Sequence, residues 1–251
     1  MSQEPPGFPP DPSDPGSSFP PPFPGGPPAA TGGGIPWERR DEIGLVAALI
    51  ETTKQVLTGP TDFFRRMPVA GGLGSPLLYA VIIGYLGILV SAVYSSVFML
   101  VGGAASGAFG SFGDRPEVAR IVEAFSGWGG IIGQVLFGPF GIVIALFVST
   151  AITHVMLMLL DGASQGFEAT FRVRSYASAA SVLAIVPFCG GLIAAIWSLV
   201  ICIIGLAEAQ RIPVWKAALA VLLPIVLCCC CCSAGLGMFF GSIASMLSQQ
   251  R

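Results

Sequence analysis

The sequence predicts an all-α, polytopic membrane protein, a helical bundle with five transmembrane helices and a disordered N-terminal tail. Of the 251 residues, 53% are hydrophobic and only 10% are charged, which leaves too few ionic groups to cover a water-soluble globule of this length. The charged residues also gather in short stretches between long uncharged segments, a pattern typical of loops that join membrane spans. The lipid bilayer is therefore the first expected partner.

Composition also excludes several classes of site. A net charge of −2 without a basic block argues against nucleic acid as a partner. The seven cysteines lie in apolar sequence, at Cys189, Cys202 and 228–232, and the chain has one histidine, so neither a disulfide framework nor a zinc site is indicated. The cysteine run favours small apolar packing. We expect no catalytic residue, no metal site and no cofactor.

Residues 1–36 are predicted to form a disordered, cytoplasmic tail. They are rich in Pro and Gly and contain no Lys or Arg, so they cannot bury enough apolar surface to offset the entropy of ordering. Their overlapping P-x-x-P spacings leave open an alternative in which polyproline II segments dock on an aromatic groove.

Residues 37–76 are predicted to lie on the membrane surface. Apolar residues recur at three- and four-residue steps, with a polar face between them formed by Glu42, Glu51, Lys54 and Gln55. The apolar positions are Ile43, Val46, Ile50, Thr53 and Leu57. This pattern indicates an amphipathic helix whose apolar face meets lipid or the bundle.

A second short surface helix should follow the break at Gly59-Pro60. Phe63 and Phe64 stand beside Arg65 and Arg66, and this grouping suits aromatic rings in the headgroup zone with cations at the phosphates.

Residues 77–241 form the predicted membrane domain, followed by a short tail at 242–251. The uncharged stretch 77–101 is the first span, and 131–160 is the second, with a bend expected at Gly138-Pro139. Between them, the polar loop 109–130 has room for a short helix after Pro116. The last span is 217–240.

The stretch 176–207 is harder to divide. Its 32 residues would make about 48 Å of helix, too long for one untilted span. Pro187, Gly190 and Gly191 favour two short spans joined by a tight turn at 187–191. With five spans and a cytoplasmic N-terminus, nine Lys and Arg fall inside and three outside; with four spans, eight fall inside and four outside. Five spans are favoured, with the C-terminus outside.

Several motifs resemble the prokaryotic branch of the Yip family, the Ypt/Rab-interacting membrane proteins. The run at 166–177 contains Tyr176, and it is followed by the segments 186–191, 196–198 and 205–210. The upstream motif spans 52–67. Positions that carry the likeness are Pro60, Phe63, Phe64, Tyr176, Pro187, Gly190, Gly191, Trp197 and Gly205. The resemblance covers about residues 37–240.

This resemblance implies a five-helix membrane domain with a cytoplasmic N-terminus, in the cytoplasmic membrane of a prokaryote. Eukaryotic members are linked to vesicle trafficking and small GTPases. Their aspartate-leucine-tyrosine-glycine-proline signature is absent from this chain, so a GTPase partner is not implied.

Three ionisable residues are candidates inside the membrane domain. His154 and Asp161 are seven positions apart, on nearly one face of a continuous helix, and Glu208 could join them in a proton or ion relay. The favoured interpretation is instead interhelical hydrogen bonding. The pentapeptide around Ser164 matches G-x-S-x-G, but it joins two helices and follows the histidine, so hydrolase chemistry is not expected.

Two functions remain open. The first is a non-enzymatic scaffold or adaptor that presents residues 37–67 and the tail to a soluble protein partner. The second is a small transporter or channel, with 187–191 as a discontinuous helix near its pore. Small residues at four-residue spacing, such as Gly129 and Gly133, suit a compact bundle or a homo-oligomer equally well.

Overall fold

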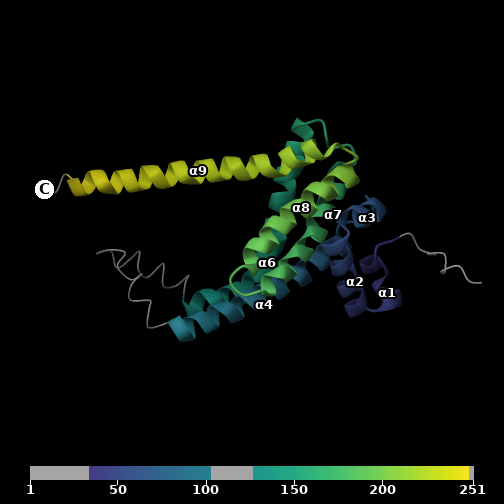
Figure 1. Ribbon diagram of the computed structural model, residues 1–251, viewed down its shortest axis with the longest axis horizontal. Coiled ribbons are helices and arrows are strands. Elements are labelled where there is room, and N and C mark those ends of the chain that lie inside the picture. The colour runs from purple at the N-terminus through teal and green to yellow at the C-terminus, as the bar shows by residue number, and fades with distance from the viewer. Residues whose placement is uncertain (1–33, 103–126, 249–251) are drawn as a thin grey trace, which may run out of the picture. The chain divides into compact units, whose positions relative to one another are not determined.

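The computed structural model describes residues 34–102 and 127–248. The predicted tail lies outside these ranges except for its last three residues, and so does most of the loop 109–130. Figure 1 shows the elements: η1 (Pro36–Arg39), α1 (Arg40–Ile43), α2 (Leu45–Thr58), α3 (Pro60–Arg66), α4 (Gly74–Gly102), α6 (Trp128–Leu159), α7 (Gly166–Ala177), η3 (Ser178–Ile185), α8 (Gly190–Gln210) and α9 (Val214–Ser248). Within the described ranges every regular element is helical, which confirms the all-α class.

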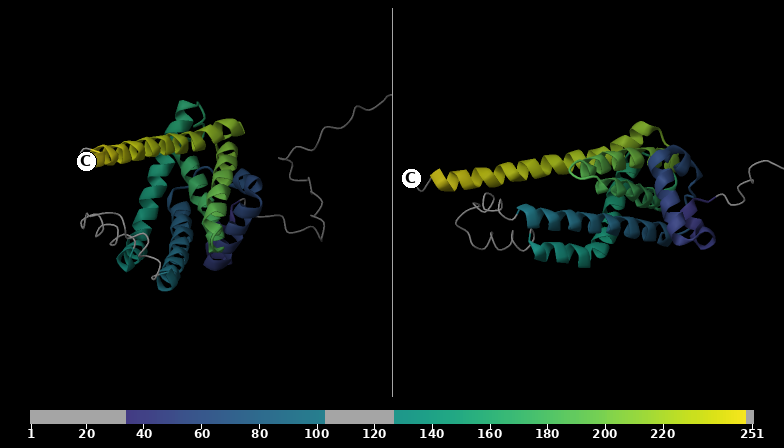
Figure 2. Two further views of the ribbon diagram at one scale, coloured as in Figure 1. Left: turned by 60° about the vertical axis from the view of Figure 1, so that its left-hand side comes forward. Right: turned by 60° about the horizontal axis from the view of Figure 1, so that its bottom comes forward.

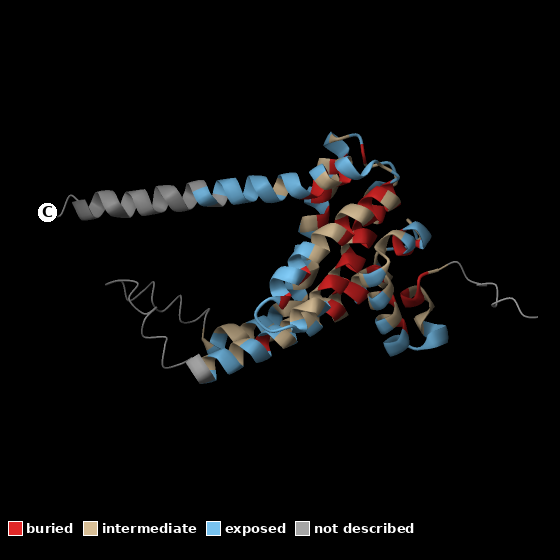
Figure 3. Ribbon diagram, in the orientation of Figure 1, coloured by how far each residue is buried: buried red, intermediate tan, exposed pale blue. Residues whose placement is uncertain are grey.

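Four of these helices are long and apolar enough to cross a membrane: Gly74–Leu100, Trp128–Leu159, Gly190–Gln210 and Val214–Cys231. Large apolar side chains are exposed along them, as the pale blue stretches of Figure 3 show, and Phe98 and Phe137 are 77% and 70% exposed. Apolar surface on this scale is unusual in a water-soluble monomer but is the ordinary lipid-facing surface of a membrane bundle. The chain is therefore an integral membrane protein.

Helices α4 and α6 are antiparallel neighbours that approach through glycines. A Cβ atom added to Gly138 would lie 2.6 Å from Cδ1 of Ile88, and one added to Gly84 would lie 3.0 Å from Cδ1 of Ile142. Residue numbers rise along one helix as they fall along the other in these contacts. Small residues here allow the close helix packing that membrane bundles use. Helix α6 continues through Pro139 to Leu159.

The elements α7 and η3 form one arm of a hairpin and α8 forms the other, side by side in both views of Figure 2. The turn predicted at 187–191 is present: the N–H of Gly190 donates to the carbonyl of Val186 at 3.0 Å. A Cβ atom at Gly190 would lie 2.6 Å from the carbonyl oxygen of Leu183, so the turn requires glycine. Phe188, with φ of +66°, projects fully exposed from the turn.

The third predicted span, within 176–207, differs from its expected form. It is the second half of an arm that begins at Gly166, and its residues after Ala177 adopt 3₁₀ geometry. Twelve α-helical and eight 3₁₀ residues rise about 34 Å in total, enough for a hydrocarbon core of about 30 Å. The first half carries Glu168, Arg172 and Arg174, so the arm is not apolar throughout. The count of five spans stays a prediction.

Helix α9 also differs, because it continues to Ser248 beyond the boundary expected at residue 241. The sequence after Phe240 contains no proline, and a single glycine does not end a helix.

Residues 36–67, which comprise η1 and α1–α3 and are called the cap below, pack against α4, α7 and α8 at one end of the bundle (Figure 1). The expectation that Phe63 and Phe64 lie in the headgroup zone is wrong. Both side chains are almost completely buried, Phe63 against Tyr176 and Phe64 against Gly205. Aromatic rings beside arginines fit both a membrane interface and a buried position, and Gly205 of α8 leaves room here for the ring of Phe64.

The face of α2 that packs against the protein differs from its predicted apolar stripe. The face that packs against the protein carries small or β-branched residues, Ala48, Thr52 and Val56. The larger Val46 and Ile50, which belong to the predicted apolar stripe, are 66% and 62% exposed. Close packing in membrane proteins favours small residues, and here the bulkier stripe is the one left exposed.

Gly205 provides a test of the contact between cap and bundle. A Cβ atom there would lie 2.7 Å from Cγ1 of Val173 and 2.8 Å from Cε2 of Phe64, so Gly205→Ala should lower the free energy of unfolding by about 1–3 kcal/mol through overpacking. The matched control is Gly191→Ala in the same helix, where no atom lies within 4 Å. Thermal unfolding in detergent would measure both, and equal midpoints for the two variants would contradict the packing described here.

Candidate functional site

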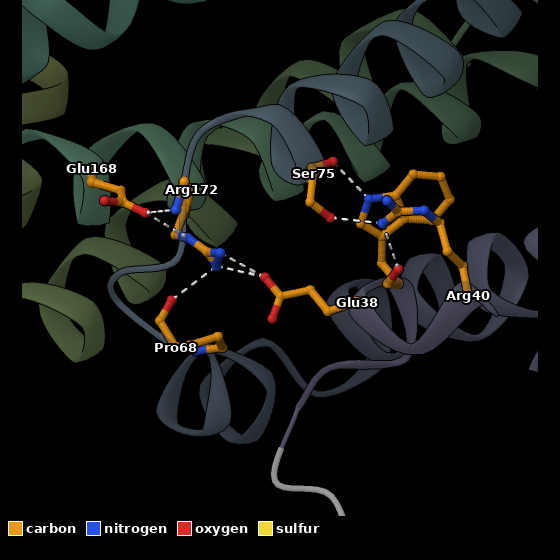
Figure 4. A network of polar contacts seen from close by, with 8 residues as sticks. Glu38, Arg40, Pro68, Ser75, Glu168 and Arg172 are labelled. Carbon is orange, nitrogen blue, oxygen red and sulfur yellow. Dashed lines mark hydrogen bonds and ion pairs between the residues drawn. The ribbon is translucent and has the colours of Figure 1, made fainter. Parts of the chain in front are cut away.

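A buried arginine lies where the cap meets the bundle. Arg172, in α7, is 1% exposed, and its Nη1 and Nη2 donate to Oε1 of Glu38 at 2.6 and 2.7 Å (Figure 4). Nη1 also donates to the carbonyl of Pro68 at 3.2 Å. Burying a guanidinium is costly unless it is paired and hydrogen-bonded, and Glu38 provides that pairing from η1, 134 residues earlier in the chain.

Glu168 completes the cluster from one helical turn before Arg172. Its Oε1 lies 3.5 Å from Nε of Arg172 and accepts a hydrogen bond from the backbone N–H of Gly72 at 2.6 Å. The two carboxylates therefore attach three segments to one another: η1, the loop that precedes α4, and α7. We call Glu38, Glu168 and Arg172 the clamp.

Beside the clamp, four aromatic rings from four elements form a continuous packed group. Trp37 meets Tyr79 edge to face at 5.4 Å between centroids, Tyr79 lies 5.2 Å from Tyr176, and Tyr176 lies 5.4 Å from Phe63. The indole N–H of Trp37 donates to the carbonyl of Ser75 at 2.7 Å. Each pair of this kind adds roughly 0.5–1.5 kcal/mol beyond its buried area.

Polar contacts beside the four aromatic rings also attach the cap to α4. The guanidinium of Arg40 lies 5.3 Å from the centre of the Trp37 ring, and its Nη1 donates to Oγ of Ser75 at 2.9 Å. The hydroxyls of Tyr79 and Thr53 are hydrogen-bonded at 2.8 Å, which ties α2 to α4. The cap is thus held to the bundle through α4, α7 and α8.

Arg65 makes a more exposed link between α3 and α8. Its Nη2 lies 3.3 Å from Oε1 of Glu208, and this hydrogen bond raises the pKa of Arg65 above its ordinary value. Exposed pairs contribute little to stability, so this link orients α3 more than it stabilises the fold.

The sequence model of the Yip1 domain matches residues 54–236. That range covers well over half of the chain. The chain belongs to the Yip1 family. Neither a curated protein nor a solved structure matches it.

The family-motif residues separate into three groups in this Yip1 domain. Phe63, Phe64, Tyr176 and Gly205 meet at the junction of cap and bundle. Pro60 opens α3 at its first position, where the missing N–H costs no hydrogen bond. The remaining group belongs to the hairpin: Pro187, Gly190 and Gly191 form its turn, and Trp197 packs partly buried against the core.

The three ionisable candidates do not form a relay in the described geometry. Nδ1 of His154 and Oγ1 of Thr170 lie at 3.0 Å, while Glu208 pairs with Arg65. The expectation that Asp161 shares a helix face with His154 is wrong, since α6 ends at Leu159 and Asp161 is an exposed turn residue with φ of +49°. A short polar turn after the helix ends the periodicity on which that expectation rested.

His154 instead joins a network around the start of α7. Nε2 of Gln210 donates to Oγ1 of Thr170 and to the carbonyl of Gly166, both at 2.9 Å, and Oε1 of Gln210 accepts from the backbone N–H of Gln165 at 2.7 Å. The hydroxyl of Ser164 donates to the backbone carbonyl of Gln210. Ser164 therefore helps to hold α8 against the α6–α7 turn, and its geometry is that of a structural serine.

Among the residues that the structure describes, no group of three or more His, Cys, Asp or Glu side chains converges.

Sequence reasoning missed the clamp. The charged stretches between the apolar segments are interpreted as loops, whereas Arg172 lies in α7, among buried residues that include Phe171 and Tyr176. No local signal in the sequence indicates its burial, because Arg172 and Arg174 alternate with other residues in one charged stretch and arginine is seldom fully buried unless it is paired. Its partner Glu38 lies too far away in sequence to be paired with it.

Glu38→Ala should leave Arg172 buried without its main partner and lower the free energy of unfolding by about 3 kcal/mol. Hydrogen exchange in the cap should accelerate, because η1 loses its attachment. Glu42→Ala, at an exposed carboxylate of α1, is the matched control and should change neither quantity.

A double variant separates the ion pair from simple packing. Replacing both partners, as Glu38→Met with Arg172→Met, should destabilise less than Glu38→Ala alone, because no unpaired charge remains buried. A larger loss in the double variant would show that the clamp matters for shape and not for charge.

Proposed function

We propose that this Yip1-family membrane protein is a non-catalytic scaffold that presents its cap to a soluble protein partner, with a role in membrane organisation or a process akin to trafficking. The observation that supports it most is the attachment of the cap, which is held by the clamp, the aromatic group and Phe64 on Gly205. A recognition surface that is rigid before binding loses less entropy on association.

The polar face of α2 and α3 is the candidate recognition surface. Nε2 of Gln55 donates to Oε1 of Glu51 at 2.9 Å, and Nη2 of Arg66 approaches Oε1 of Gln55 at 3.5 Å. Lys54 is exposed between them. This row of alternating donors and acceptors is solvent-accessible and suits a polar protein surface of complementary charge.

We further propose that the cap lies on the cytoplasmic side of the cytoplasmic membrane of a prokaryote, with five crossings and the C-terminus outside. In support, the cationic side chains of the cap, Arg211 and Lys216 gather at one end of the hairpin, while residues 178–207, which include its turn, carry no charge. The exposed Val46 and Ile50 of α2 suit contact with the lipid surface beside the bundle.

The transporter alternative has less support. It relied on 187–191 as a break within a membrane helix, and in the structure this segment is an exposed turn between two antiparallel arms. Half-helix ends at a substrate site lie inside the bundle.

The topology can be tested with the native thiol in that turn. In a variant that lacks the cysteines at 202 and 228–232, an impermeant maleimide added outside intact cells should label Cys189, which is exposed in the turn. In a further Cys189→Ala background, Lys54→Cys should be labelled only after permeabilisation. The opposite pattern of labelling would overturn the proposed orientation.

Partner binding should depend on the polar face. The exchange Glu51→Lys with Lys54→Glu should abolish cross-linking of the principal partner in cells while expression and insertion stay unchanged, because total charge is preserved and the packed face of α2 is untouched. Arg211→Asn, which removes an exposed cation at the end of α8, should leave cross-linking of the partner intact.

A transporter predicts the reverse for the same variants. If reconstituted protein carries a solute into liposomes, loses that flux on Pro187→Ala, and keeps it after the Glu51/Lys54 exchange, the scaffold function must be abandoned.

A further inference from the structure

Arg174 is a second arginine of α7, two residues after the clamp arginine, and it has a different environment. It is partly buried, and its Nη1 lies 3.6 Å from Sγ of Cys202 on α8. Within the part of the chain that the structure describes, no carboxylate lies within ion-pairing distance of it. A thiol is only a weak acceptor, so the charge of Arg174 has no anionic partner among the described residues.

Arg174 also lines a cavity of about 280 Å³ between α6, α7 and α9. Arg174 is the charged residue of its lining, and Ser149 and Thr153 of α6 make the neighbouring wall partly polar. Their hydroxyls already donate to carbonyls of their own helix, at 3.2 and 2.8 Å, which leaves the arginine as the strong donor in the cavity.

The rest of the lining includes apolar side chains that are partly exposed. Ile152 of α6 and Ile225 of α9 line the cavity and are 46% and 42% exposed. A ligand with one anionic group and hydrocarbon chains could therefore place the anion at Arg174 while its chains remain against these side chains and the surrounding bilayer.

The depth of the cavity follows from the start of α9. Trp215 is exposed there, and Nζ of Lys216 lies 5.8 Å from the centre of its ring, a pairing typical of the membrane interface. Val221 and Ile225, both in the cavity wall, come six and ten residues later, about 9–15 Å deeper along the helix. Arg174 thus lies within one leaflet, where an isolated cation draws in water or an anion.

We propose that this cavity binds the phosphate of an anionic membrane phospholipid, with Arg174 as the residue that holds it. Guanidinium groups form bidentate hydrogen bonds with phosphate, and basic pockets between transmembrane helices are suited to anionic lipid headgroups. The volume is slightly below the roughly 300 Å³ at which small-ligand sites begin, which fits a headgroup and not a whole lipid. Such a site could operate in a scaffold or a transporter alike.

Native mass spectrometry of the full chain in neutral detergent tests the site, with phosphatidylglycerol and phosphatidylcholine supplied in equal amounts. Wild-type protein should retain phosphatidylglycerol with a preference of about tenfold, and Arg174→Gln should remove that preference. Arg174→Lys should keep part of it. Arg211→Asn removes a cation outside the cavity, at a left-handed position that asparagine tolerates, and should keep all of it.

A second variant covers the case in which Arg174→Gln fails to fold. Ile152→Trp fills the cavity from a lipid-exposed position without changing any charge, and it should also remove the preference. Retention of the preference in folded Arg174→Gln or Ile152→Trp would overturn the proposal, and so would an equal loss in Arg211→Asn. Competition by inorganic phosphate would identify a soluble-anion site, and competition by oleate alone a fatty-acid site; either result would also overturn it.

Discussion

The charge of Arg172 is the constraint on which the arrangement of the cap depends. Most of α7 from Ala169 onward is buried among other elements, and a guanidinium there must be met by anions and carbonyls from the protein itself. Glu38, Glu168 and Pro68 meet that demand, and they come from three different segments. Satisfying one side chain therefore fixes the position of η1 and of the loop before α4.

The arm that carries this charge is itself unusual. With Glu168, Arg172 and Arg174 in its first half, the arm lacks the uniform apolarity of the neighbouring helices. Its second half is made of small residues such as Ala179 and Ala180, which are buried against the bundle. The 3₁₀ geometry lengthens that half, so η3 keeps pace with α4 beside it from Tyr79 to Tyr94, whose side chains contact Tyr176 and the carbonyl of Ile185.

Much of this fold is predictable from sequence, and the rest fails for definable reasons. Long uncharged stretches identify the apolar helices, and the Pro187, Gly190 and Gly191 set identifies the hairpin turn, because both signals are local. Which residues become buried, in contrast, depends on partners that are distant in the sequence. Phe63 and Phe64 beside arginines look like interfacial residues until Gly205, over 140 positions later, is known to receive one of them.

The helical faces show a related limit. In α2, hydrophobicity picks out Val46 and Ile50, while the protein packs against Ala48 and Thr52. In membrane proteins small residues, and not bulky ones, are favoured where helices pack closely. Hydrophobic periodicity therefore locates the helix but not the face that packs against the protein. Likewise, a high density of charged residues distinguishes a loop from a span only when those residues are exposed, and Arg172 is buried.

The distance between Glu38 and Arg172 in the chain has a consequence for how the protein is made. Glu38 leaves the ribosome first, and its partner follows 134 residues later, at about 5–20 residues per second. For about 7–27 seconds Glu38 has no Arg172 to pair with, while Ser75 and Tyr79 of α4 are already available to the N-terminal segment. Arg172 then arrives as the last member of the clamp, so the ion pair completes a docking of the N-terminal segment that its contacts with α4 can begin.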